Sequence, residues 1–216
     1  MKIYQNAGKV IAQKNFSEDY RGSISLIESF KSSSNIVPIS ITKKIGLKNI
    51  INFANSFGLG YQHEFEEFPS LAIGAYGDNL LNITNAYSAI NNNGKIQSPE
   101  ILEKIESLND KSIWENKFIS KKLLDLKINK KINKLLEKSV KEGTSKAASI
   151  KGKKIYGKTG TSDGNKDLWF IGSIDNLTTG IWIGYDNNKE SELSSGNAAY
   201  LWKKFISEIY KIPIKK

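Results

Sequence analysis

Apolar and polar positions in the first half of the chain alternate with a helical period. Apolar side chains recur every three or four residues, which predicts helices at about residues 25–33, 36–45, 47–57 and 79–92. Local signals agree with this pattern, because Ser25 and Glu28 form a capping box and Gly46 is suited to end a helix. These short, separate helices indicate a packed helical layer.

The period changes in the second half. A fifth helix is expected from about Asn129 to Gly143, and residues 154–162, 168–174 and 178–185 are then apolar and β-rich. A last helix follows at about 198–209, and short strands are expected around 101–105 and 113–118. Three consecutive strands between helices predict an α/β (α+β) fold, with an antiparallel sheet flanked by helices.

Composition excludes several classes of function. The 216 residues suit one domain, and with no Cys and one His (His63) the chain cannot build disulfides or multi-His metal sites. Sites of these two kinds are therefore excluded. The net charge of +10 is carried by Lys, with Arg21 the one Arg, so codon composition explains it better than nucleic-acid binding. Neither a membrane span nor a signal peptide is predicted within the chain.

The most informative motif is Lys158-Thr-Gly-Thr-Ser162, on the first predicted strand. A strand with one Lys and two Thr side chains offers a cation and hydroxyl donors to a carboxylate. Gly160 removes a side chain where a substrate backbone could approach, and the backbone N–H near Thr161 could stabilise an oxyanion. We therefore take Lys158, Thr159, Gly160 and Thr161 as candidate site residues.

Lys-Thr-Gly is one of three elements of serine penicillin-recognising enzymes, beside Ser-x-x-Lys and Ser-x-Asn. The flanks also resemble the C-terminal two-thirds of the transpeptidase domain of class A penicillin-binding proteins. The similar blocks, in the same order as in that family, are Asn15…Tyr20-Arg21-Gly22, Ser33-Ser34-Asn35, Pro69-Ser70-Leu71-Ala72-Ile73-Gly74-Ala75, Ala86-Tyr87-Ser88, Asn93-Gly94, Gly143-Thr144…Ala147, Lys158–Ser162, Asp167-Leu168-Trp169-Phe170-Ile171-Gly172, Trp182-Ile183-Gly184-Tyr185-Asp186 and Ala198-Ala199-Tyr200-Leu201-Trp202.

The resemblance implies the fold of that family, which β-lactamases share, and peptidoglycan cross-linking by serine acyl transfer from D-Ala-D-Ala stems, on the periplasmic or extracytoplasmic face of the membrane. Peptidoglycan stem peptides and β-lactams would be the ligands, and the resemblance implies no metal and no cofactor. Ser-x-Asn occurs at Ser33–Asn35, Ser107–Asn109 and Ser195–Asn197, and the first of these has the family's position. By resemblance, Ser33 shuttles protons, Asn35 binds the substrate amide, and Lys158 and Thr161 hold the terminal carboxylate.

The sequence departs from the family in its nucleophile. The family's Ser-x-x-Lys precedes Ser-x-Asn by some fifty residues, whereas the one match here, Ser40-Ile-Thr-Lys43, follows it. We expect the nucleophile to lie outside this chain, in which residues 1–216 form a partial transpeptidase domain without the glycosyltransferase domain and membrane anchor. A separately encoded N-terminal fragment could supply the rest. The chain alone is then expected to be inactive and prone to associate through an uncovered apolar face.

Other readings of the sequence remain open. A split or decayed gene product could keep the binding surface without turnover, as a non-catalytic binding or interaction remnant. A free-standing serine β-lactamase-like hydrolase is disfavoured, since it needs a Ser-x-x-Lys of its own. His63 is expected on a surface or interface, Trp169, Phe170 and Trp182 in the core, and the turn at 163–165 beside the cleft.

Overall fold

The computed structural model of the chain describes residues 2–6, 9–13, 15, 22–60 and 68–213. Its helices are α1 (Leu26–Lys31), α2 (Ile36–Ile45), α3 (Leu47–Ser56), α4 (Leu80–Asn91), α5 (Leu126–Glu142) and α6 (Ser195–Ile209). Its strands are β1 (Lys2–Asn6), β2 (Lys9–Gln13), β3 (Lys95–Gln97), β4 (Lys104–Glu106), β5 (Ser112–Glu115), β6 (Ser120–Lys122), β7 (Ile155–Thr161), β8 (Asp167–Ile174) and β9 (Leu177–Gly184). Within the described ranges, no helix has the length and apolar character to cross a bilayer.

The first four predicted helices are present, and local side chains fix their ends. The Ser25 hydroxyl accepts a hydrogen bond from the Glu28 N–H at 3.1 Å, and the Asn79 side chain accepts one from the Asn82 N–H at 2.8 Å. Between α2 and α3 the backbone turns at Gly46, whose φ of 88° suits a residue without a Cβ. These boundaries were predictable because each depends on residues close in sequence.

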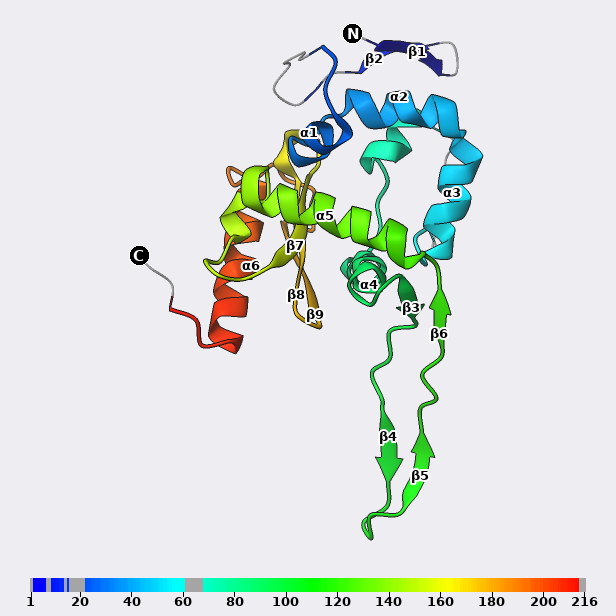
Figure 1. Cartoon of the computed structure of the whole chain (residues 1–216), viewed down its shortest axis with the longest axis vertical. Coiled ribbons are helices and arrows are strands. Elements are labelled where there is room, and N and C mark those ends of the chain that lie inside the picture. The colour runs from blue at the N-terminus through cyan, green and yellow to red at the C-terminus, as the bar shows by residue number, and fades with distance from the viewer. Residues whose placement is uncertain (1, 7–8, 14, 16–21, 61–67, 214–216) are drawn as a thin grey trace.

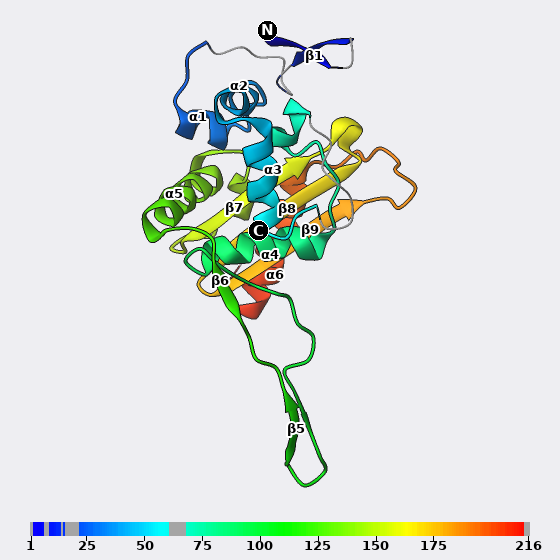
Figure 2. The same cartoon turned by 90° about the vertical axis from the view of Figure 1, so that its right-hand side faces the viewer.

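Residues 98–119 form a hairpin, here named the arm, that extends away from the rest of the molecule (Figures 1 and 2). Its strands β4 and β5 pair with each other, while β3 and β6 pair at its base. The predicted strands at 101–105 and 113–118 are only partly right. Ile101 and Phe118 lie beyond the last paired residues of the ladder, and both side chains are exposed.

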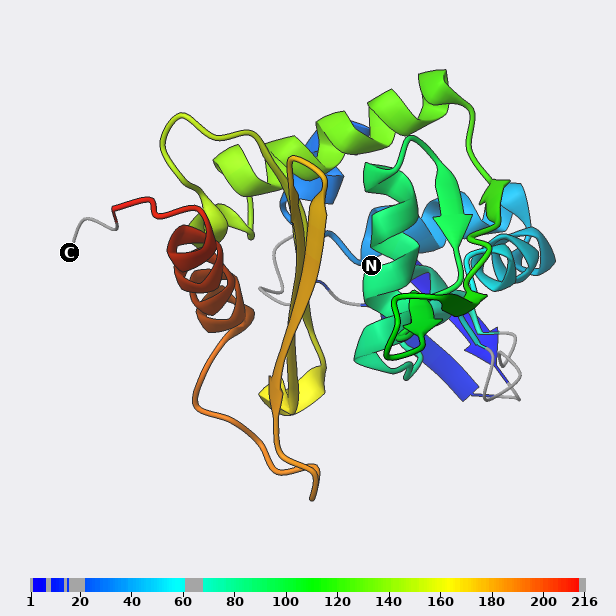
Figure 3. The ribbon, with the colours of Figure 1, turned by 90° about the horizontal axis from the view of Figure 1, so that it is seen from below.

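The three predicted C-terminal strands form one antiparallel sheet in the order β7-β8-β9, so the predicted meander is confirmed. In the register, Thr159 on β7 lies opposite Phe170 on β8, and Trp169 lies opposite Trp182 on β9. Figure 3 shows α6 on one face of this sheet, α4 on the other, and α5 crossing at one end. The expected α/β layer arrangement is therefore present.

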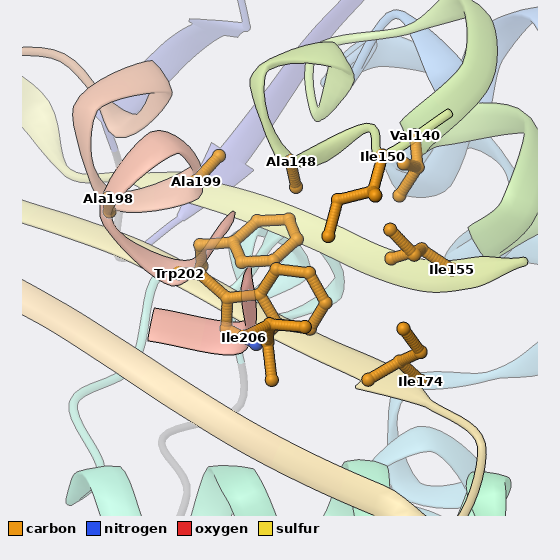
Figure 4. Close-up of a cluster of buried hydrophobic side chains, with 10 residues drawn as sticks. Val140, Ala148, Ile150, Ile155, Ile174, Ala198, Ala199, Trp202 and Ile206 are labelled. Atoms are coloured by element: carbon orange, nitrogen blue, oxygen red, sulfur yellow. The ribbon is translucent and has the colours of Figure 1, made fainter. Parts of the chain in front are cut away.

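The larger hydrophobic core lies between α6 and the sheet (Figure 4). Trp202 is fully buried and meets Phe170 edge-to-face, with 5.3 Å between the ring centroids. Gly172 lies beneath these rings, where an added Cβ would come within 2.6 Å of Phe170 and 2.7 Å of Trp202. The cluster consists of Val140, Ala148, Ile150, Ile155, Phe170, Ile174, Ala198, Ala199, Trp202 and Ile206.

Helix α5 begins three residues earlier than predicted, at Leu126 after the N-cap residue Asp125. The apolar pattern did not reveal this first turn, because its apolar residues Leu126 and Ile128 are exposed and do not belong to the buried face of the helix. Asn129, the predicted first residue, is instead buried, and its side-chain amide donates to the Ile90 carbonyl at 3.0 Å. This bond ties α5 to α4.

Candidate active site

Lys158 lies in the middle of β7, and its side chain reaches toward the turn between α1 and α2. Its ammonium donates to the hydroxyls of Ser33 and of Thr144, the latter at 3.4 Å, and to the Thr159 carbonyl at 3.0 Å. An ammonium has three N–H donors, so these acceptors use its full capacity. The structure thus joins two motifs that are 125 residues apart.

Ser33 is held in an unusual backbone conformation. Its φ of 53° lies in the left-handed region, which side chains with a Cβ adopt at a cost of about 1–3 kcal/mol. The neighbouring turn is fastened to Asn15, whose side-chain oxygen accepts from the Asn35 N–H at 3.0 Å and from the Ser34 hydroxyl at 3.3 Å. This turn directs the Ser33 hydroxyl at Lys158 and Thr144.

The segment between α5 and β7, here named the 143–145 loop, lies beside the site. The Thr144 hydroxyl is 2.7 Å from the Thr159 hydroxyl and 3.2 Å from that of Ser33. Ser145 is buried, accepts from the Thr159 N–H at 3.1 Å, and pairs with the Ser139 hydroxyl at 2.8 Å. Sequence reasoning did not select Thr144 or Ser145 as site residues, although the Gly143-Thr144 block contained the signal.

Burial determines the electrostatics of the site. It lowers the pKa of Lys158 from 10.5 to about 8, because removal from water disfavours the charged ammonium. The Phe30 ring lies 6.0 Å from the ammonium, and among the described residues no salt bridge neutralises this cation. A cation held by neutral hydroxyls attracts an anionic ligand such as a carboxylate.

The other candidate residues lie around this centre. Asn35 stands at the start of α2, two residues after Ser33, and Thr161 is exposed at the end of β7, about 10 Å along the strand from Lys158. Thr159 is buried and bonded to Thr144. A Cβ on Gly160 would lie 3.3 Å from Trp169, so tight packing between β7 and β8 favours glycine there.

The end of β7 is fixed by a second group of side chains. The Ser162 hydroxyl donates to Asp167 at 2.9 Å, and the Trp182 indole N–H donates to the same carboxylate at 3.0 Å. Phe170 is fully buried, whereas Trp169 and Trp182 are half-buried and pack with ring centroids 6.4 Å apart. The turn at 163–165 follows directly, next to Thr161 and Ser162.

Several sequence-based candidates do not join the site. Ser40 of the one Ser-x-x-Lys match donates its hydroxyl to the Ile36 carbonyl at 2.8 Å, within α2. Asn109 lies at the tip of the arm, and Ser195 begins α6. Among the described residues, no group of three His, Asp or Glu side chains could hold a metal ion. His63, Tyr20 and Arg21 lie outside the described residues.

The 143–145 loop passes so close to α1 that residue 143 has no room for a side chain. A Cβ there would lie 2.3 Å from the Lys31 carbonyl oxygen and 2.9 Å from that of Ser139. We expect Gly143→Ala to lower the unfolding free energy by about 1–3 kcal/mol, since backbone must move on both sides. Urea denaturation measures this, with Gly77→Ala as the control because its Cβ would meet nothing within 4 Å. Equal stabilities of the two variants would contradict the packing described.

Comparison with known proteins identifies the family of the chain. The family model described as the penicillin binding protein transpeptidase domain matches residues 2–206. Penicillin-binding protein 1A of Clostridium botulinum strain Hall is 31% identical over 217 residues, covering 98% of this chain and 26% of its own length. The Rickettsia typhi protein of the same name is 32% identical over 200 residues, covering 82% and 25%. The chain thus spans about a quarter of the curated relatives it matches.

Solved structures show the same fold. The crystal structure of penicillin-binding protein 1A from Haemophilus influenzae superposes with a TM-score of 0.85 at 21% identity, covering all of this chain and 39% of that one. The D,D-transpeptidase domain of a peptidoglycan glycosyltransferase from Eggerthella lenta gives 0.74 at 21% identity, covering 99% and 59%. With the family model matched over nearly its whole length, the chain belongs to the penicillin binding protein transpeptidase domain family.

Proposed function

We propose that this chain forms part of the site of a D-Ala-D-Ala transpeptidase that cross-links peptidoglycan by serine acyl transfer. The observation that carries the proposal is the contact between Lys158 of the Lys-Thr-Gly strand and Ser33 of the Ser-x-Asn turn. Two motifs that match the family's in sequence also meet in space, around a partly buried cation. Such a site suits a stem peptide with a terminal carboxylate, and a β-lactam as its mimic.

Each candidate residue has a proposed role. Lys158 and Thr161 attract and orient the terminal carboxylate, with Thr159 and Gly160 completing the strand along which the substrate lies. The Asn35 amide binds the substrate's peptide carbonyl. In acylation, Ser33 passes a proton to the leaving D-Ala amine as its C–N bond breaks and regains the proton that the attacking serine hydroxyl gives up. In the second step, Ser33 takes a proton from the acceptor amine and returns one to the serine oxygen as the ester bond breaks.

The nucleophilic serine is proposed to lie outside these 216 residues. Support comes from α2, where the hydroxyl of Ser40 is bonded to its own helix and Lys43 is exposed. The serine would come from another part of a transpeptidase domain, in the same polypeptide or in a separately encoded fragment. Attack by that serine on the penultimate D-Ala carbonyl would form the acyl-enzyme and release D-Ala.

Exposed apolar side chains support a missing covering segment. Leu26 on α1, Ile45 on α2, Phe53 on α3 and Leu81 on α4 are each more than half exposed. Within the described residues, β9 is also an edge strand, eight residues long and without a charged side chain. Long, uncharged edges promote pairing with another chain. We propose that the rest of a transpeptidase domain covers these surfaces.

The 216-residue chain alone is therefore expected to associate in solution. Light scattering coupled to size-exclusion chromatography at micromolar concentrations should give masses above the 24.1 kDa of one chain. The cause to be tested is the apolar surface, so Phe53→Lys together with Leu81→Lys should shift the distribution toward the monomer. A monodisperse wild-type monomer with a sharp, cooperative melting transition would contradict this expectation.

We propose that the site lies on the extracytoplasmic side of the membrane, where peptidoglycan stems would be its ligands. The direct test of ligand recognition is a calorimetric titration of the chain with a stem peptide ending in D-Ala-D-Ala, with the L-Ala-L-Ala peptide as control. Preferential binding of the D,D peptide supports the proposal. Absence of binding by either peptide would contradict it, and binding without acylation in any completed domain would favour a non-catalytic remnant.

Carboxylate binding should depend on pH with a midpoint near 8. Burial lowers the pKa of Lys158 to about 8, so the ammonium is about nine-tenths charged at pH 7 and about one-tenth charged at pH 9. Peptide affinity is then expected to fall about tenfold between these values. The charged side chains of the neighbouring helices form salt bridges with one another: Lys31 bonds to Glu28 at 2.9 Å and to Glu142 at 3.5 Å. Affinity constant to pH 9 would contradict a role for the Lys158 charge.

A further inference from the structure

The Thr144 hydroxyl stands where the two motifs meet. It lies 3.2 Å from the Ser33 hydroxyl, 2.7 Å from the Thr159 hydroxyl and 3.4 Å from the Lys158 ammonium. These partners come from the turn before α2 and from β7, and Thr144 itself belongs to the 143–145 loop after α5. One side chain therefore touches three of the candidate site residues.

The backbone of Thr144 is fixed on both sides. Its N–H donates to the Lys31 carbonyl at 3.0 Å, in the last turn of α1. Gly143 packs without a side chain between two carbonyl oxygens, and Ser145 is bonded to the Thr159 N–H at 3.1 Å. The loop thus fastens α1 to β7, and the Thr144 hydroxyl has a defined position relative to both.

Hydrogen-bond capacity shows what that hydroxyl can do. A hydroxyl donates once and accepts twice, and Lys158 occupies one acceptor position. Thr144 therefore accepts from one of the Ser33 and Thr159 hydroxyls and donates to the other. When it donates to Ser33, the Ser33 oxygen accepts from both Thr144 and Lys158, and its own proton is free to point toward a substrate atom.

We propose that Thr144 is a positioning residue of this site. Its hydroxyl fixes the position of the Ser33 hydroxyl relative to the Lys158 ammonium and sets the direction of the Ser33 proton. The three contacts carry the positioning itself, and the role of that positioning in catalysis rests on the proposed function. Without the hydroxyl, Ser33 loses one of its two described side-chain partners, and the ammonium loses one of three acceptors.

The test compares Thr144→Val, which keeps the shape and removes the hydroxyl, with Thr144→Ser, which keeps the hydroxyl. We expect Thr144→Val to weaken D-Ala-D-Ala peptide binding at pH 7 about tenfold, and Thr144→Ser to stay within about twofold of wild type. Side-chain NMR titration of Lys158, assigned with Lys158→Arg, is the second readout. The midpoint should move to lower pH in Thr144→Val and return to the wild-type value in Thr144→Ser.

The two readouts separate this inference from the proposed function. A wild-type chain that binds no peptide but shows the Lys158 shift in Thr144→Val would refute the function and retain the positioning role. Unchanged peptide affinity and an unchanged Lys158 midpoint in folded Thr144→Val would refute the positioning role. Thr144→Ala provides a second hydroxyl-free variant. If circular dichroism shows both hydroxyl-free variants unfolded, Thr144 is a structural residue and the proposal is overturned.

Discussion

Replacing Lys158 with methionine is expected to weaken binding of a D-Ala-D-Ala peptide by about 10- to 100-fold. A ligand carboxylate that replaces one of the ammonium's present acceptors forms a charge-assisted hydrogen bond, which contributes about 1.5–3 kcal/mol. Methionine removes the charge while keeping most of the apolar stem. Lys158 is the cation that the structure places at the meeting point of both motifs. Its loss should therefore affect ligand binding more than any other single change in the site.

The same substitution should not lower stability, and this distinguishes a binding role from a structural one. The pKa of Lys158 in the folded chain, about 8, is below the unfolded value of 10.5. At pH 7 the folded state therefore holds this charge at a cost, which disappears only as the pH rises from 8 to 10.5. We expect the unfolding free energy of Lys158→Met at pH 7 to equal or exceed that of wild type.

Calorimetric titration and urea denaturation of Lys158→Met measure these two effects. Lys151→Met is the matched control, because Lys151 is exposed and lies four residues before the strand that carries the site. The control should bind peptide like wild type. Normal peptide affinity in Lys158→Met, or a large loss of stability with no loss of affinity in the folded fraction, would contradict the role assigned to this residue.

Replacing Trp202 with alanine is expected to cause the largest loss of stability, about 3–5 kcal/mol. Trp202 is fully buried between α6 and the sheet and packs edge-to-face on Phe170 at 5.3 Å. Gly172, which lies beneath the ring, has no side chain that could fill the space left behind, so a cavity would remain. For a chain of this length, the melting temperature should fall by about 6–20 °C.

Thermal denaturation monitored by circular dichroism measures the effect, and two further variants serve as comparisons. Phe205→Ala removes another aromatic ring from the same helix, but that ring is 47% exposed and the loss should be below 1 kcal/mol. Trp202→Phe should fall between the two, because the Trp202 indole N–H has no partner among the described residues. Equal losses for Trp202→Ala and Phe205→Ala would show that the core lies elsewhere.

Short-range features of the fold were predictable because their causes are local. Ser25 and Asn79 cap helices through bonds spanning three residues, and Gly46 ends α2 by its own backbone preference. The start of α5 was missed because its first turn is exposed, and the ends of the arm strands because Ile101 faces solvent. The β1–β2 hairpin was not predicted either, since its register is set by cross-strand pairing.

The candidate site likewise contains residues that could be selected from the sequence and residues that could not. Lys158 could be selected because the Lys-Thr-Gly-Thr-Ser motif is rare, and Ser33 because its Ser-x-Asn match has the position that the family gives it. The role of Thr144 could not, because its partner Ser33 is 111 residues away and only the folded chain brings the two together. Thr159 was expected to face a substrate, and its hydroxyl bond to Thr144 is likewise a tertiary feature without a local signal.

The most direct test of the account is labelling with a fluorescent penicillin, followed by peptide mapping of the labelled serine. The 216-residue chain is compared with the same chain fused behind the preceding part of the Clostridium botulinum penicillin-binding protein 1A transpeptidase domain. We expect no covalent label on the chain alone, and a label on the added segment in the fusion that is strongly reduced by Lys158→Met. A stoichiometric label on any serine of the chain alone would contradict the claim that the nucleophile lies outside it.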